Sequence, residues 1–194
     1  MAKLYFYYAA MNAGKSTTLL QSSFNYRERG MSTMLFTSAL DDRFGANIIS
    51  TSIGLDAEAQ TFDDTTDIYH VIEKNAAAEG TKCVFIDEAH FLTRAQVLAL
   101  TKVPDYLDIP VICYGLRTDF QAKLFEGSAA LMALADEMVE LKTICDCGKK
   151  AIMNLRVDDK GQAIKEGAQK EIGGEERYIP LCRRHFMQRV GDME

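Results

Sequence analysis

A short glycine-bearing loop between an apolar segment and a helix constrains this chain more than any other feature. The loop spans residues 9–16 and reads AAMNAGKS. Residues 4–8 (LYFYY) predict a buried strand before it, and residues 16–29 predict a helix after it, with Gly30 as the C-cap. A strand, a loop ending in Gly-Lys-Ser and a helix form the context of a Walker A loop, whose backbone N–H groups hold phosphates.

Two side chains of the loop have chemistry suited to ATP. Lys15 supplies a positive charge within reach of the β- and γ-phosphates, and the Ser16 hydroxyl is a ligand for Mg²⁺. The usual pattern has glycine where this loop has Ala9, so the methyl group requires a negative φ there. The alternative is a Gly-Lys turn without a ligand, but the strand–loop–helix context favours phosphate binding.

Beyond the loop, predicted strands and helices alternate. Strands are expected over residues 34–37, 83–86 and 111–115, and helices over residues 67–79 and 93–102, the latter with Thr93 as N-cap. Because these strands are apolar on both faces, the pattern predicts an α/β fold of the P-loop (RecA-like) type, a parallel sheet with helices on both faces. Functional residues are then expected beyond the carboxyl ends of the strands.

The strand over residues 83–86 ends in Asp87-Glu88-Ala89-His90. Asp87 occupies a Walker B position and is expected to hold Mg²⁺, and Glu88 can take a proton from an attacking hydroxyl. The same letters spell the DEAH box of helicases, but those need two ATPase domains and a basic nucleic-acid track. Two solvated carboxylates at a strand end are the remaining alternative. The residues expected to bind ATP and Mg²⁺ are Ala9, Ala10, Met11, Asn12, Ala13, Gly14, Lys15, Ser16, Asp87, Glu88, Ala89 and His90.

Composition argues against several classes of partner. The 194 residues carry a net charge of −6, whereas a surface for a nucleic acid polymer normally has a basic excess. No apolar run approaches the roughly 20 residues of a membrane span, and the N-terminus lacks the pattern of a signal peptide. We therefore expect a cytoplasmic protein, in which clustered cysteines favour metal binding over disulfides.

The character of the chain changes after about residue 141. Cysteines, glycines and charges gather there, and alternating segments at residues 152–157 and 164–172 predict hairpins. We expect a nucleotide-binding domain over residues 1–141 and a small domain over residues 142–194. Two pairs of ligand-type residues in the latter, Cys145 with Cys147 and Cys182 with His185, fit a structural, tetrahedral Zn²⁺ site. Reduced cysteines in a small core are the alternative.

Several motifs, in this order, resemble those of the cytosolic, zinc-containing thymidine kinases, here of a bacterial type. They are AAMNAGKSTTLLQ (residues 9–21), DDRFG (41–45), VFIDEAHFL (84–92), CYGLRTDF (113–120) and IGGEERY (172–178). The resemblance covers residues 3–186. It implies transfer of the γ-phosphoryl group of ATP to thymidine, and relatives that bind structural zinc and are commonly homotetramers. Two positions depart from the family pattern, Ala9 and His90, where the family usually has Gly and Gln.

The resemblance also assigns roles to residues. Glu88 matches the general base that takes the proton of the thymidine 5′-hydroxyl, and Arg43 matches an arginine near the transferring phosphoryl group. Residues 172–178 match a loop, the "lasso", that closes over thymine. The positions that match the nucleoside site are Met11, Asp41, Arg43, Phe91, Leu116, Phe120, Ile172, Gly173, Gly174 and Tyr178. A P-loop kinase or NTPase with another acceptor, and a nucleotide-gated binding protein without turnover, remain as alternatives.

Overall fold

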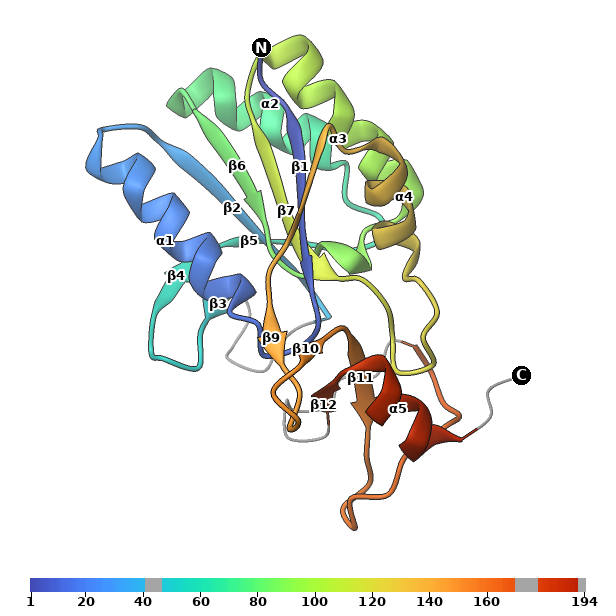
Figure 1. Cartoon of the computed structure of the whole chain (residues 1–194). Helices are drawn as coiled ribbons and strands as arrows, with labels where there is room; N and C mark the ends of the chain where they lie inside the picture. Colours follow the sequence, from blue (N-terminus) through green and yellow to red (C-terminus); the bar gives the residue numbers. More distant parts are fainter. Residues whose placement is uncertain (41–46, 170–177, 192–194) are drawn as a thin grey trace.

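A parallel β-sheet forms the centre of the molecule (Figure 1). The computed structural model describes residues 1–40, 47–169 and 178–191, and all structural statements concern these residues. The sheet has the strand order β5-β2-β6-β7-β1-β8, and every neighbouring pair in it is parallel. Its strands are β1 (Leu4–Ala9), β2 (Thr33–Ser38), β5 (Gln60–Phe62), β6 (Cys83–Ile86), β7 (Val111–Leu116) and β8 (Glu137–Glu140).

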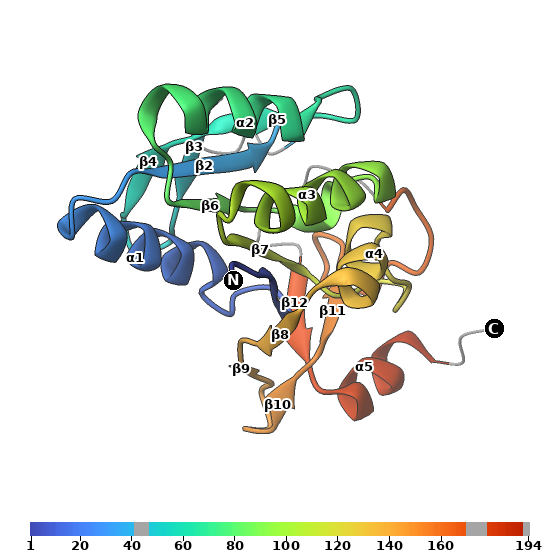
Figure 2. The ribbon, with the colours of Figure 1, turned by 90° about the horizontal axis from the view of Figure 1, so that it is seen from above.

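Helices cover both faces of this sheet (Figure 2). Helix α1 (Lys15–Glu28) packs on one face, where Leu19 and Leu20 share a buried cluster with Phe85. Helices α2 (Ile68–Glu79), α3 (Arg94–Leu107) and α4 (Glu126–Leu134) pack on the other, in a cluster that includes Ile86. Successive strand residues thus point to opposite faces, and both faces are apolar because both are covered. The α/β class expected from the alternation is confirmed.

Local signals account for most of these elements. Thr93 caps α3 through a capping box with Gln96, and the Asp67 side chain accepts the His70 N–H at the start of α2. Gly30 has a φ of 73° just beyond α1, a left-handed conformation that glycine adopts without strain. Phe24, one turn after Leu20 on α1, is 49% exposed.

Other elements were not expected from the sequence. A hairpin of β3 (Ile48–Ser50) and β4 (Asp56–Glu58) follows β2, with Ile49 buried in the cluster beneath α1. Neither α4 nor α5 (Arg183–Val190) was expected. Among the described residues, no helix has the length and apolarity needed to cross a membrane.

The C-terminal part of the chain has a buried cluster of its own. This part of the chain contains two antiparallel strand pairs and helix α5. The pairs are β9 (Thr143–Ile144) with β10 (Lys150–Ala151), and β11 (Met153–Arg156) with β12 (Tyr178–Leu181). Leu155, Leu181 and Phe186 lie at the centre of this cluster. The strand expected at residues 152–157 is present as β11, whereas the described portion of 164–172 contains no strand. The division into two domains at residue 141 stays a prediction, which the separate cluster supports.

Candidate functional site

The phosphate loop connects β1 to α1, as the sequence predicted. Gly14 is the N-cap of α1 with a φ of 73°, and Asn12 has a φ of 56°. Both conformations are left-handed, which glycine adopts freely and asparagine tolerates better than most residues. The Lys15 side chain is almost buried, and its Nζ lies 3.4 Å from the Ala10 carbonyl oxygen. The loop thus holds a cation at the N-terminus of a helix, where phosphate oxygens are favoured.

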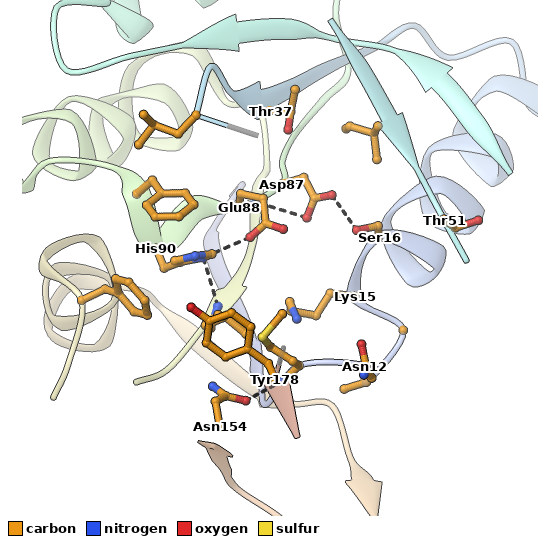
Figure 3. Close-up of a pocket in the computed structure, with 18 of the residues that line it drawn as sticks. Asn12, Lys15, Ser16, Thr37, Thr51, Asp87, Glu88, His90, Asn154 and Tyr178 are labelled. Carbon is orange, nitrogen blue, oxygen red and sulfur yellow. Dashed lines mark hydrogen bonds and ion pairs between the residues drawn. The ribbon is translucent and has the colours of Figure 1, made fainter. Parts of the chain in front are cut away.

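Ser16, at the start of α1, and Asp87, directly after β6, lie side by side, although they are 71 positions apart in sequence. The Ser16 hydroxyl donates to Asp87 Oδ2 at 2.7 Å (Figure 3). The Asp87 N–H donates to the Phe36 carbonyl oxygen, which anchors the residue directly after β6. A hydroxyl and a buried carboxylate side by side at a phosphate loop are hard oxygen donors, and this donor set fits Mg²⁺.

Glu88 has a left-handed backbone, with a φ of 51°. Such a conformation is strained for a glutamate, and strain of this kind is frequent at functional sites. The Glu88 N–H donates to Asp87 Oδ1 at 3.0 Å, and the residue is the N-cap of a 3₁₀ turn, η1 (Ala89–Phe91). The tight turn directs the side chain into the cavity described below (Figure 3).

His90 is buried next to Glu88. Its Nδ1 lies 3.3 Å from Glu88 Oε2 and accepts the Leu116 N–H at 3.3 Å. Nδ1 therefore lies within reach of both a backbone donor and a carboxylate acceptor. The ring also contacts those of Phe91 and Phe125, at centroid distances of 4.1 and 4.5 Å. His90 thus connects the turn that carries Glu88 to the end of β7.

A cavity of about 490 Å³ joins these groups. Its volume falls within the range of small-molecule sites. The predicted residues that line it are Met11, Asn12, Ala13, Gly14, Lys15, Ser16, Asp87, Glu88, His90, Phe91, Leu116, Phe120 and Tyr178. Ala9, Ala10 and Ala89 are buried and do not line it. The predicted residues Asp41, Arg43, Ile172, Gly173 and Gly174 lie outside the described residues, so their roles stay predictions.

Part of the cavity wall was not predicted from the sequence. Thr37, Thr118, Asp119, Phe125, Asn154 and Gln169 also line the cavity. Gln169 Nε2 donates to Asp119 Oδ2 at 2.8 Å, which connects a C-terminal loop to the segment after β7. Of these residues, Asn154 is the one that the sequence could have indicated as part of a site, because it is a polar residue between Met153 and Leu155 in an otherwise apolar segment.

The expected metal ligands come together away from the cavity lining. The ligand atoms of Cys145, Cys147, Cys182 and His185 all lie within 4.8 Å of one another. Cys147 Sγ and Cys182 Sγ are 3.9 Å apart, and tetrahedral ligands at about 2.3 Å from zinc are about 3.8 Å from each other.

The state of one thiol in this cluster also suits a metal. Burial raises the pKa of the Cys145 thiol, but hydrogen bonds from the Cys147 and Cys182 backbone and from His185 lower it overall to about 6. The thiolate, the form that binds zinc, is therefore favoured at neutral pH. The cluster fits a closed structural zinc site, because four protein ligands leave no open position.

Proteins similar to this chain over nearly its whole length share one family name. A family model described as thymidine kinase matches residues 2–186. A thymidine kinase of Novosphingobium aromaticivorans is 61% identical over 98% of this chain and 100% of its own length. Thymidine kinases of Vibrio cholerae and Zymomonas mobilis are 56% and 55% identical, over 98% and 100% of this chain and the whole of their own lengths. The chain therefore belongs to the thymidine kinase family.

Proposed function

We propose that this protein is an ATP-dependent thymidine kinase that converts thymidine and ATP into dTMP and ADP, with deoxyuridine as a second acceptor. The observation that carries the proposal is that the phosphate loop, at Lys15 and Ser16, and Glu88 line the same cavity. Family membership supports thymidine as the acceptor. The cavity wall adds the aromatic residues Phe91, Phe120 and Tyr178, which suit a nucleobase.

In the proposed reaction Glu88 removes the proton of the thymidine 5′-hydroxyl as its oxygen attacks the γ-phosphorus, and the bond to ADP breaks. Lys15 and the loop N–H groups offset the negative charge of the phosphates, which is the main demand of phosphoryl transfer. Ser16 and Asp87 would hold Mg²⁺, which neutralises phosphate charge when bound. Arg43 is proposed to act beside the transferring group, and Asp41 beside Arg43, on the resemblance alone.

The C-terminal part is proposed to close the nucleoside site. Tyr178 starts β12, four residues before the zinc-ligand candidate Cys182. A structural Zn²⁺ at the Cys145, Cys147, Cys182 and His185 cluster would fix one end of the lasso, residues 172–178. The lasso residues Ile172, Gly173 and Gly174 would bind the base through backbone groups. A cytoplasmic location and a homotetramer are also proposed; light scattering of the purified protein tests the latter.

The test is transfer from γ-labelled ATP to a panel of nucleosides. We expect labelled monophosphate with thymidine and deoxyuridine and none with deoxycytidine, and we expect Lys15→Ala to abolish the product. Transfer to another acceptor would support a P-loop kinase of other specificity. Release of labelled phosphate without an acceptor would indicate an NTPase, and nucleotide binding without either product would indicate a switch protein.

A further inference from the structure

The side chain of Asn154 connects two walls of the cavity that belong to different parts of the sequence. Its Oδ1 accepts the Met11 N–H at 2.8 Å, and its Nδ2 donates to the Thr118 carbonyl oxygen at 3.0 Å. Met11 is in the phosphate loop, and Thr118 follows β7. Asn154 itself lies on β11, in the C-terminal part of the chain. One amide group thus joins three segments around the cavity.

The position of Asn154 within β11 explains why its side chain reaches these loops. Side chains alternate along a strand, so Asn154 lies on the opposite face from Met153 and Leu155. Those two neighbours belong to the buried cluster of the C-terminal part, whereas Asn154 lines the cavity. A buried amide is costly unless its polar groups are paired, and here both have backbone partners.

The same strand carries a connection to the nucleoside side of the cavity. Asn154 is opposite Pro180 in the β11–β12 pair, two residues from Tyr178, which lines the cavity. Two weaker contacts accompany the bridge: Arg117 Nη2 donates to the Ile152 carbonyl oxygen, and Thr143 Oγ1 donates to the Asn12 carbonyl oxygen, both at 3.3 Å. The two hydrogen bonds of Asn154 are shorter than these two contacts. Of the three side chains involved, Asn154 is buried, whereas Arg117 and Thr143 are partly exposed.

We propose that Asn154 is a positioning residue that holds the phosphate loop and the nucleoside wall in register, by accepting from Met11 and donating to Thr118. The bridge also engages the Met11 N–H, so that the later N–H groups of the loop keep one arrangement. Without the amide, the partly buried Met11 N–H and the buried Thr118 carbonyl oxygen lose these partners, and the two walls can move independently. This proposal rests on the proposed function, because its main measurement is phosphoryl transfer.

The test compares Asn154→Leu with Asn154→Asp. Leucine has a similar volume but cannot bond, so we expect kcat/KM for thymidine to fall about tenfold or more, with a higher KM and a lower kcat. Aspartate can replace both bonds only when protonated, because its neutral carboxyl group accepts from Met11 and donates to Thr118. The ratio of Asn154→Asp to parent kcat should therefore rise as the pH falls, while the Asn154→Leu ratio stays flat.

Val157→Ala is the matched control for general destabilisation. Val157 is buried in the same C-terminal cluster and does not line the cavity. Measured well below its melting temperature, this variant should keep kcat and KM within about twofold of the parent even where its Tm falls as far as that of Asn154→Leu. Equal kinetic loss at an equal Tm shift would overturn the proposal. A pH-independent Asn154→Asp ratio would overturn the Thr118 half of it.

A separate measurement distinguishes failure of the proposed function from failure of the proposed role of Asn154. If the parent does not phosphorylate thymidine, the function is wrong, but the bridge is still tested by calorimetric titration with Mg²⁺ and ADP, which needs no acceptor. Asn154→Leu should then weaken ADP binding by about threefold or more, and Val157→Ala should not. Unchanged ADP affinity together with unchanged kinetics in Asn154→Leu would overturn the proposal.

Discussion

Glu88 combines a strained backbone with a side chain that lines the cavity. Its φ of 51° is maintained by the Asp87 carboxylate, which accepts the Glu88 N–H, and by the 3₁₀ turn that follows. A left-handed glutamate persists only where its surroundings determine the conformation. The strain is therefore consistent with a carboxylate whose direction matters, as the proposed role of general base requires.

Glu88→Gln tests the proposed role of Glu88 as general base, because it replaces one carboxylate oxygen with an NH₂ group. The substitution keeps the shape of the side chain but removes the basic oxygen, so kcat should fall by roughly 10²–10⁴. The dissociation constant for ADP should change less than about twofold, because the loop and Lys15 are untouched. Steady-state kinetics and calorimetry measure the two effects. Glu137→Gln, in an exposed pair with Lys3, is the control and should keep full activity; equal activity in Glu88→Gln would exclude this residue as the base.

Gly115 shows how closely β7 approaches the turn that carries His90. A Cβ atom at Gly115 would lie 2.9 Å from the His90 backbone nitrogen and 3.5 Å from its Nδ1. Because a backbone atom cannot move aside cheaply, one of the two segments must shift. The absence of a side chain at Gly115 therefore permits the contact between Leu116 and His90.

We accordingly predict that Gly115→Ala lowers kcat about tenfold and destabilises the fold by about 1–3 kcal/mol. The displaced turn carries Glu88 with it, so activity should fall at temperatures where the variant is still folded. Thermal melts and kinetics on the same sample separate the two effects. A variant with parental kcat would mean that the turn can shift without moving the Glu88 carboxylate.

Residues of the site were predictable where their chemistry is local to a motif. The order strand, Gly-Lys-Ser, helix specified the phosphate loop, and Asp87 and Glu88 followed an apolar run as expected. Asn154 was not predictable as a bridge, because its partners are backbone groups more than thirty positions away. Backbone partners leave no residue-type signal in a sequence, and only the folded arrangement reveals them.

At the scale of elements, α4 is positioned by the turn behind the site. A Cβ atom at Gly127 would lie 2.6 Å from the Ala89 carbonyl oxygen and 2.7 Å from that of Leu92. Helix α4 can approach η1 this closely only with a glycine at that position. Phe125, the N-cap residue of α4, then contacts the ring of His90. The helix thus supports the turn that carries the proposed base.

Gly127→Ala sets two effects against each other. Helix propensity alone predicts a stabilisation of about 0.5–1 kcal/mol from glycine to alanine inside a helix. The contact with two backbone carbonyls should outweigh it, so we expect a net loss of about 1–3 kcal/mol and a lower Tm. Ala129→Gly, at an exposed position of the same helix, is the control and should cost only the propensity difference. A higher Tm for Gly127→Ala would show that α4 can move outward freely.

The elements that were predicted and those that were missed differ in their signals. β6 matched its expected bounds, because four apolar residues followed directly by two charged ones predict a short buried strand that ends at the charges. The N-cap residue of α4 (EGSAALMAL) is Phe125, which cannot form a side-chain cap, so the sequence carries no local signal for the start of this helix. In α5, Phe186 and Val190 supply the buried face at a spacing of four residues, too short a pattern to separate from hairpins in a cysteine-rich segment.

For the whole molecule, the cysteine cluster joins two segments of the C-terminal part. Cys145 and Cys147 lie between β9 and β10, and Cys182 and His185 lie at the start of α5. A metal ion there would cross-link a part of the chain whose apolar cluster is small. Metal binding to such a site contributes directly to the stability of the part that contains it.

Cys182→Ser should therefore release bound zinc and lower the Tm, and chelation of the parent should have the same effect. With the base of the lasso released, KM for thymidine should rise more than KM for ATP. Zinc content by mass spectrometry, thermal melts and kinetics provide the readouts. Cys113→Ala, at a buried position within β7, serves as control and should retain zinc. Unchanged Tm and KM in zinc-free protein would contradict the structural role.

The position of β1 within the sheet determines when, during synthesis, the phosphate loop can take its shape. Although β1 precedes the other described strands in the sequence, its neighbours are β7 and β8, which end at Leu116 and Glu140. Pairings between segments so distant in sequence form slowly, because the entropy of closing a long loop is lost before the contacts contribute favourable free energy. A nascent chain on the ribosome therefore cannot enclose β1 before Glu140 has emerged. Until then β1 is an exposed apolar segment, which makes incomplete chains candidates for chaperone binding.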